Sequence, residues 1–345
     1  MAEHARIDHG VVRRVIAGAL AREDVPPQVR AIEADLMTEA ELHGVPSHGL
    51  LMLSRLIGGF REGRATPDPF IRVIRESGAT CVLDGDRGPG RYVGVQGMRA
   101  AVERAGRFGI GACLVTATTH WGRAHAYACL AAEEGFIGIC TTNAIPNMLA
   151  PGSSRPVLGN NPLAIAAPRG GGRRPVVLDI AMSQAALGRV ATAEREGKAA
   201  PAGWGLDENG NPTTDAAAIL ASRNLLPMGG HKGAGLALMM EMLTGALGGA
   251  LLSHEIAEAD DSGLDAGSSK LFLAVDVGAF GDRARFEERV EDLLTHVRTN
   301  SSGPDAGYPG ERGWRTRAEY ERDGIPVHPG VITALQAVGV DLRPE

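Results

Sequence analysis

Two histidines stand in sequence contexts that suit proton transfer. His48 lies in the segment HGVPSHGL, directly after Ser47 and before Gly49, at the expected start of a helix. Ser47 there would cap the free helix amides, and Gly49 would leave room for a ligand. Such an imidazole can deliver a proton to a carbonyl oxygen while hydride arrives at the carbon. The alternative is a histidine that merely caps the helix or faces solvent.

His120 is the second candidate. It stands in TATTHWGRAHAY, after an expected strand and before an expected helix. That position is the carboxyl end of a strand, where the sites of α/β proteins usually form. The alternative is a buried histidine that is hydrogen-bonded to the backbone.

A third segment suits an anion. LLPMGGHKGAGLALMM opens a helix after two glycines, and the free amides there, with Lys232, can hold a phosphate group. An ordinary exposed lysine is the alternative. MLAPGSSRPVLGNNPLAIAAP is read as a second polar turn region that interrupts apolar elements.

Several common enzyme patterns fail. Gly88, Gly90 and Gly94 resemble a dinucleotide fingerprint, but the third glycine is one residue too far and the acidic residue expected downstream is missing. No strict G-x-S-x-G occurs, and Ser47 and His48 are sequence neighbours, which is poor geometry for a Ser-His relay. The segment EGKAA lacks the glycine and the hydroxyl of a Walker A loop. These absences argue against a Rossmann domain, a serine hydrolase and a P-loop NTPase.

The cysteines predict neither a zinc cluster nor a disulfide framework. They are irregularly spaced, without a C-x-x-C pair, and have apolar neighbours, as buried free thiols do: Cys81, Cys113, Cys129 and Cys140. We therefore expect no metal. The net charge of -6, without a basic block, predicts no partnership with nucleic acid or a membrane and favours a small-molecule role. The N-terminus resembles no signal or transit peptide, so a cytoplasmic location is expected.

The helices and strands that must position these residues are predicted to form an α/β protein. Residues 1–75 are predicted to be helical, and from Thr80 the pattern changes to short apolar or β-branched runs: 80–85, 111–119, 136–144, 175–183 and 270–280. Ala-rich helices are predicted at 96–109 and 124–135, each closed by a glycine. Alternation of strands and helices indicates the α/β class.

The last third of the chain is expected to return to helices. The acidic, Gly/Ser-rich segment 255–270 is interpreted as a mobile surface loop without chemistry. An amphipathic helix is predicted at 285–299, and a Gly/Pro loop then leads to a helical tail at 318–340.

Taken together, a series of long blocks resembles, in the same order, the type-2 malate/L-lactate dehydrogenase family, which includes L-sulfolactate dehydrogenases. The resemblance runs from about residue 7 to residue 340. The blocks are PSHGL, HWGRAHAY, TTNAIPNMLAPGS, LGNNPLAIAAP, VVLDIAMSQAALG, GWGLDENGNPTTD, LLPMGGHKGAGLALMMEML and YPGERGWRTR.

The resemblance implies a family-specific, non-Rossmann α/β fold that binds NAD or NADP. It implies that 1–75 and 285–345 form one helical substrate and dimerisation domain, and that 76–284 bind the cofactor. A homodimer with self-complementary contacts is also implied.

The resemblance also assigns roles by position. His48 matches the family's proton donor or acceptor, His120 a second active-site imidazole, and Ser47 or His120 would polarise the carbonyl. We expect Asp179 to orient and charge His48, because a helix N-terminus would otherwise depress its pKa. The residues implied to contact the nicotinamide nucleotide are Val177, Leu178, Asp179, Ile180, Ala181, Met182, Ser183, His231, Lys232, Gly310 and Glu311.

Two departures bear on the substrate. Many relatives have an arginine four residues after the histidine, suited to bidentate capture of a carboxylate, but this chain has Met52. Arg55, a further turn along, is a candidate replacement. Asn160 replaces a threonine in a G-T-N-P segment and, with Asn143, is a candidate substrate contact.

Three functions follow from the resemblance. The first is reversible hydride transfer between NAD(P)H and a small 2-oxo acid, and the second is reduction of a cyclic imine-2-carboxylate, which Met52 favours by reshaping the pocket. The third is a catalytically silent nucleotide-binding protein. NAD and NADP stay alternatives, because Arg173, Arg174 and Arg189 suit either a 2′-phosphate or solvent.

Overall fold

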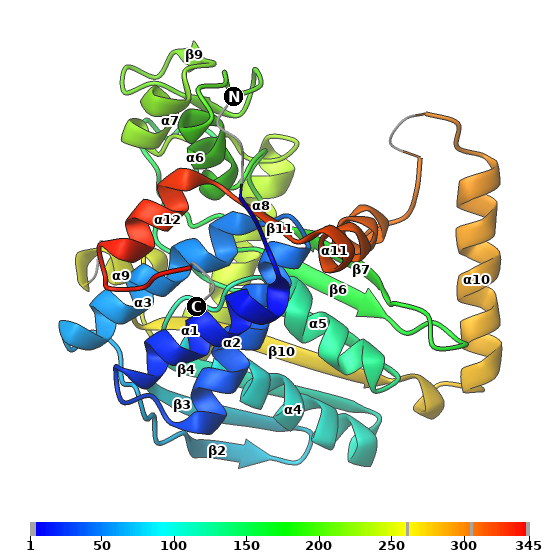
Figure 1. Cartoon of the computed structure of the whole chain (residues 1–345). Coiled ribbons are helices and arrows are strands. Elements are labelled where there is room, and N and C mark those ends of the chain that lie inside the picture. Colours follow the sequence, from blue (N-terminus) through cyan, green and yellow to red (C-terminus); the bar gives the residue numbers. More distant parts are fainter. Residues whose placement is uncertain (1–4, 260–261, 304–305, 343–345) are drawn as a thin grey trace.

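A seven-stranded sheet forms the centre of the protein. The computed structural model describes residues 5–259, 262–303 and 306–342. The strand order is β2-β3-β4-β10-β5-β6-β7, and β3 and β4 are parallel while every other neighbouring pair is antiparallel. Figure 1 shows helices α4 and α5 across one face of this sheet, with the N-terminal helices beyond them. The mixed strand directions exclude a Rossmann sheet, and the predicted α/β class is confirmed.

The strands are short and closely follow the apolar runs of the sequence. Their bounds are β1 Ala5–Ile7, β2 Arg72–Ser77, β3 Thr80–Gly88, β4 Ile110–Thr118, β5 Phe136–Thr142, β6 Leu163–Ala167, β7 Val176–Ile180, β8 Gly205–Leu206, β9 Pro212–Thr213, β10 Ser268–Asp276 and β11 Ile325–Val327. Strands β3, β4, β5, β7 and β10 fall where the sequence predicts them.

Helices surround the sheet and form a separate N-terminal layer. Their bounds are α1 His9–Ala21, α2 Pro27–Leu42, α3 Leu50–Arg61, α4 Gly90–Phe108, α5 Ala124–Glu133, α6 Leu187–Arg195, α7 Ala216–Ser222, α8 His231–Glu241, α9 Ser253–Ala259, α10 Arg283–Thr299, α11 Glu311–Asp323 and α12 Pro329–Gln336. Short helical turns lie at Pro46–His48 (η1), Met242–Ala246 (η2, a π-turn) and Val277–Ala279 (η3). None of the described helices is both long and apolar enough to cross a membrane.

Small residues let α4 lie directly on the sheet. A Cβ on Gly111 of β4 would lie 2.0 Å from the carbonyl oxygen of Ala101, and one on Gly97 of α4 would lie 2.6 Å from the Phe272 ring. Backbone therefore meets backbone at this crossing. The larger apolar residues, among them Met98, Val115 and Phe272, fill the remaining space and are buried.

The N-terminal layer is completed by the C-terminal end of the chain. Strand β1 pairs with β11 in antiparallel register, Ala5 opposite Val327 and Ile7 opposite Ile325. Helix α12 packs on α3, and the apolar faces of α1, α2 and α3 share one core with residues of β11 and α12. The division into a helical domain of 1–75 with 285–345 and a cofactor domain of 76–284 stays a prediction. Helix α10, however, projects away from that layer (Figure 1). The next helix along the chain, α11, packs against α2.

Three details differ from the sequence prediction. Residues 72–77 form edge strand β2 rather than helix, and 163–167 form strand β6 where a polar turn was expected. The segment 255–270 is not a surface loop throughout, because α9 reaches Ala259 and β10 begins at Ser268, where Ser268, Ser269 and Lys270 are buried. Residues 260–261 of that segment lie outside the described part of the chain.

The glycines that nearly match a dinucleotide fingerprint serve packing instead. A Cβ on Gly88 would lie 2.6 Å from the Pro69 ring, and one on Gly94 would lie 2.7 Å from the Tyr127 ring. A Cβ on Gly90 would lie 2.2 Å from the Thr119 carbonyl oxygen. Each glycine therefore lets protein approach protein, and Gly90 brings the start of α4 against the backbone that carries His120.

Candidate active site

His48 ends the short turn η1 that connects α2 to α3. The Ser47 hydroxyl lies 2.9 Å from Nδ1 of His48, so it bonds the imidazole and not the helix amides. The carboxylate of Glu41 accepts the Leu50 amide at 2.7 Å instead. The expected capping role of Ser47 is therefore wrong, because a buried carboxylate from the preceding helix already occupies that amide. A Cβ on Gly49 would lie 2.3 Å from Glu41 Oε1, so this contact explains the glycine better than ligand access does.

A buried ion pair holds the backbone of His48. Arg91 at the start of α4 donates to the His48 carbonyl oxygen at 2.8 Å and lies 3.2 Å from the Glu33 carboxylate of α2. Glu33 also accepts the Tyr92 amide at 2.9 Å. The Arg91 and Glu33 side chains are 2% and 0% exposed, so this contact cannot shift without leaving a buried charge unpaired.

His120 follows β4 and faces His48. The two ring centroids are 5.6 Å apart. The Gly122 amide donates to Nδ1 of His120 at 3.1 Å, so neutral His120 carries its proton on Nε2. Gly122 has φ +75°, and a Cβ there would lie 2.8 Å from Nε of Arg91, which accounts for the glycine after Trp121.

The segment after α9 reaches this pair, contrary to the sequence prediction. The His120 amide donates to the Leu264 carbonyl oxygen at 2.6 Å. A little further on, Lys270 is fully buried in β10, where Nζ donates to Ser268 Oγ at 2.8 Å and lies 6.0 Å from the centre of the Trp121 ring. Burial lowers the pKa of Lys270 to about 7, and Asp265 opposes that change. Sequence reasoning missed Lys270 because a lysine in an apolar strand gives no sign of what faces it.

Positive charge surrounds both imidazoles. Burial, and then Arg123, Arg91 and Arg55, lower the pKa of His48 to about 3. Burial, with His48, Arg91, Arg55 and Lys270, also lowers the pKa of His120 well below its usual value. Both rings are therefore neutral at neutral pH, beside three arginines and Lys270, which is partly protonated at that pH. This environment favours an anionic ligand.

The candidate substrate residues differ in what they can still contact. Met52 is buried in α3, while Arg55 is exposed and its guanidinium lies near Gly263. Asn143 is buried and already makes hydrogen bonds to Glu241, Leu251 and Ser269. The Asn160 carbonyl oxygen accepts the Met182 amide at 2.8 Å, so Asn160 fixes the end of the expected cofactor segment through its backbone.

The residues expected to bind the nicotinamide nucleotide come from three chain segments that contact one another end to end. Their central stretch is β7 at the edge of the sheet and the turn after it. At one end the Val177 amide donates to the Pro309 carbonyl oxygen, and Gly310 packs on Val177. At the other end Met182 accepts the Met228 amide, just before His231 and Lys232, which are exposed at the uncapped start of α8. The three segments named from the sequence are thus contiguous in space.

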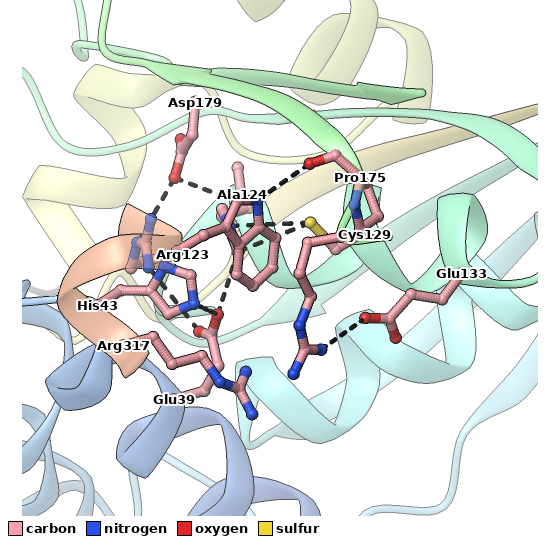
Figure 2. A network of polar contacts seen from close by, with 12 residues as sticks. Glu39, His43, Arg123, Ala124, Cys129, Glu133, Pro175, Asp179 and Arg317 are labelled. Carbon is pink, nitrogen blue, oxygen red and sulfur yellow. Dashed lines mark hydrogen bonds and ion pairs between the residues drawn. The ribbon is translucent and has the colours of Figure 1, made fainter. Parts of the chain in front are cut away.

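Asp179 lies against Arg123 and not against His48. Its carboxylate is 3.6 Å from Nε of Arg123 and accepts the His125 amide at 3.3 Å (Figure 2). The expected direct contact with His48 is absent among the described residues, because Arg123 and the start of α5 occupy the carboxylate. Arg123 is the cation that most lowers the pKa of His48, so Asp179 and His48 both interact with the same guanidinium.

The candidate site combines two neutral imidazoles with a cationic surround, beside the strip that the sequence predicts to bind a nucleotide. Comparison with known proteins shows the family. The family model for malate/L-lactate dehydrogenase matches residues 7–336, and the chain belongs to this family of dehydrogenases and reductases.

Named relatives cover nearly the whole chain. It is 34% identical to malate dehydrogenase of Pyrococcus horikoshii over 94% of this chain and 91% of the relative. It is 32% identical to the Delta(1)-pyrroline-2-carboxylate reductase of Ancylobacter novellus over 94% and 93%. The crystal structure of malate dehydrogenase from Entamoeba histolytica superposes with a TM-score of 0.93 at 28% identity, covering 98% of both chains. The predicted family is confirmed.

Glu41 provides a test of how the His48 turn is held. Burial raises the pKa of this carboxyl from 4.5 to about 7, against the opposing Leu50 amide and Arg195. The folded protein therefore holds more protons than the unfolded chain between these values, and Glu41 lowers the free energy of unfolding as pH rises through that window. In Glu41→Gln this contribution disappears, so urea unfolding should show the difference between variant and wild type changing by up to about 1.4 kcal/mol per pH unit. Exposed Glu134→Gln is the control, and parallel curves for Glu41→Gln and wild type would contradict the assignment.

Proposed function

We propose that the protein is an oxidoreductase that transfers hydride between NAD or NADP and a small 2-hydroxy or 2-oxo acid. One observation carries this proposal: the neutral rings of His48 and His120 have centroids 5.6 Å apart in a positively charged environment. Arg91 and Arg55 act on both rings, Arg123 acts on His48, and Lys270 acts on His120. Neutral imidazoles exchange protons with a hydroxyl or carbonyl oxygen, and the cations attract the carboxylate of the same small molecule.

His48 is the proton carrier in this proposal. When Nδ1 donates its hydrogen to Ser47 Oγ, Nε2 keeps a lone pair and can accept the proton of a substrate hydroxyl. In the reverse direction His48 must first be protonated. A bound carboxylate favours this by offsetting the arginines that depress its pKa.

His120 polarises the reacting oxygen. Because Gly122 fixes its Nδ1 as an acceptor, the Nε2 hydrogen is available to donate to a carbonyl or alkoxide oxygen. Asp179 contributes indirectly by partly neutralising Arg123. Removing Asp179 therefore leaves more positive charge at His48 and a poorer base.

The strip from Gly310 and Glu311 through Val177, Leu178, Asp179, Ile180, Ala181, Met182 and Ser183 to His231 and Lys232 is the proposed nucleotide site. Its fit rests on the exposed side chains of His231 and Lys232 at the start of α8, where the lysine suits a phosphate, and on the close approach of Gly310 to Val177. The nicotinamide bound there supplies or accepts the hydride.

Two substrate classes fit this site. Met52 stands where many relatives have an arginine. In this proposal Arg55 and Lys270 replace that arginine and bind the substrate carboxylate, which supports a 2-oxo acid. Met52 instead favours a cyclic imine-2-carboxylate by giving the pocket an apolar wall, and a relative named for such a reductase supports this second candidate. A silent nucleotide-binding protein is the third alternative, and the two facing histidines argue against it.

Replacing the proton carrier tests the mechanism. His48→Ala should lower kcat by about 10²- to 10⁴-fold, because general acid-base catalysis contributes this much. Cofactor affinity, measured by quenching of protein fluorescence, should stay near the wild-type value, since His48 lies outside the nucleotide strip. His254→Ala, at an exposed position, is the control. Undiminished turnover in His48→Ala would remove this residue from the mechanism.

A substrate panel separates the candidate functions. Oxidation of NADH and NADPH is followed by absorbance with 2-oxo acids, cyclic imine-2-carboxylates and matched ketones that lack the carboxylate. We expect turnover with one of the acid classes and none with the ketones, and Lys270→Met should raise KM for the acid because a buried cation is lost. Cofactor binding without turnover of any compound would favour the silent nucleotide-binding alternative.

We further propose a homodimer built on α8 and the π-turn after it. Large apolar side chains there are 37% to 63% exposed, and they are Leu236, Leu238, Met239, Met242, Leu243, Leu247 and Leu251. A continuous apolar surface of this kind is typical of a protein interface, and a two-fold pairing would make it self-complementary. It lies next to His231 and Lys232, so a second copy would pack beside the nucleotide strip.

Charge placed in that surface tests the dimer. Leu247→Asp should shift the mass measured by light scattering from twice 36.0 kDa to a single chain, because an unpaired carboxylate cannot be buried in an apolar contact. Phe108→Asp, equally apolar and 51% exposed at the end of α4, should leave the mass unchanged. Wild-type protein that sediments as a monomer at all concentrations would overturn the proposal.

A further inference from the structure

A buried group of metal-binding side chains lies behind the candidate active site. Glu39 and His43 stand one turn apart on α2, and His125 is the second residue of α5 (Figure 2). Their ligand atoms lie within 4.8 Å of one another. The side chains of His43 and His125 are 1% and 3% exposed, and that of Glu39 is 16% exposed.

One carboxylate oxygen faces both imidazoles. Glu39 Oε1 lies 3.2 Å from Nε2 of His43 and 3.1 Å from Nδ1 of His125. Neither ring nitrogen of His43 has a hydrogen bond among the described residues, despite the nearly complete burial of the ring. Nε2 lies close to Glu39 without hydrogen-bond geometry, and Nδ1 has no hydrogen-bond partner among the described residues, so the buried ring can still take a ligand.

The spacing matches ligands that share one ion. Two nitrogen or oxygen ligands of a tetrahedral Zn²⁺ lie about 3.3 Å apart, given bonds of about 2.0–2.1 Å. The Glu39 contacts to His43 and His125 are close to that separation. A set of two imidazoles and a carboxylate suits Zn²⁺ and the neighbouring transition metals.

The local charge also leaves room for a cation. Glu39 and Asp179 are both close to Arg123, whose Nη1 lies 3.9 Å from Glu39 Oε2 and whose Nε lies 3.6 Å from Asp179. Two carboxylates therefore share the Arg123 guanidinium, while Arg317, which also lowers the pKa of His43, is itself paired with Glu321 at 2.8 Å. Glu39 presents Oε2 to Arg123 and Oε1 to the imidazoles, so the arginine does not occupy the ligand side of the carboxylate.

We propose that Glu39, His43 and His125 form a binding site for a divalent transition metal, best suited to Zn²⁺. The ion ties α2 to α5, and the Trp314 ring of α11 covers both imidazoles at centroid distances of 4.7 and 5.1 Å. It thus joins the N-terminal layer, the sheet layer and the C-terminal segment behind Asp179. The role is structural, because Trp314 packs on both imidazoles and none of the three ligands belongs to the His48–His120 pair.

Metal binding is tested directly on the full chain. Protein stripped with a chelator is titrated with Zn²⁺ in a calorimeter, and the melting temperature is recorded with and without the ion. Wild type should bind one Zn²⁺ per chain and gain thermal stability. Glu39→Gln keeps the shape of the side chain but removes the anionic ligand, so it should bind at least tenfold more weakly and show no stabilisation.

Matched variants separate this site from other zinc binders. Glu133→Gln, at the exposed end of α5, and His254→Ala should bind Zn²⁺ like wild type. If Glu39→Gln or His125→Ala is poorly folded, Co²⁺ spectra of the wild type still test whether the site binds metal. A tetrahedral site gives intense visible absorption, and a surface histidine does not. Wild type that shows no such absorption and no tight Zn²⁺ binding, or Zn²⁺ binding unchanged in folded Glu39→Gln, would overturn the proposal.

Discussion

The buried ion pair of Arg91 and Glu33 is the constraint on which the candidate active site depends. It joins the start of α4, the middle of α2 and the carbonyl of His48 in a space from which solvent is excluded. Isolated buried charges cost several kcal/mol, so neither side chain can move without the other. Gly90 and Gly122 permit this arrangement, because Gly90 brings α4 against the strand end and Gly122 leaves room for the guanidinium. The positions of both imidazoles therefore follow from one interaction.

The same cations determine the chemistry of the site. Arg91 fixes the His48 backbone at 2.8 Å. Burial first, and then the surrounding cations with Arg123 before Arg91, lower the pKa of His48, while burial, His48 and Arg91 lower that of His120. An anionic ligand then does two things on arrival: it satisfies the excess positive charge, and it makes protonation of His48 easier. Substrate binding and proton uptake are therefore coupled by electrostatics, without any need for a moving part.

Much of the fold was predictable from local pattern, and the exceptions have physical reasons. Strands β4 and β5 are apolar runs bounded by turn residues, and the glycine after α4 ends that helix in a left-handed conformation. Strand β2 lies at a sheet edge with every residue exposed, so no alternation of apolar and polar residues marks it. Strand β6 is five residues long and follows a proline, which made it look like part of a turn.

The sequence suffices to name candidate site residues, but it does not give the contacts that these residues make. His48 and His120 stood out because glycines and strand ends surround them, and they do face each other. Partners such as Glu41 and Lys270 depend on which elements meet in space, and no spacing along the chain records that. Asp179 shows the same limit, because its carboxylate pairs with Arg123 and no contact with His48 is described.

The pairing of β1 with β11 also bears on how the chain matures. The N-terminal helices are made early, yet their apolar faces share a core with Ile325, Val331 and Leu335, which lie far along the chain. These faces stay uncovered until that later segment has been made, and contacts so distant in sequence form slowly. Uncovered apolar faces favour aggregation, so a chain cut before Ile325 would lack the residues that cover its N-terminal helices.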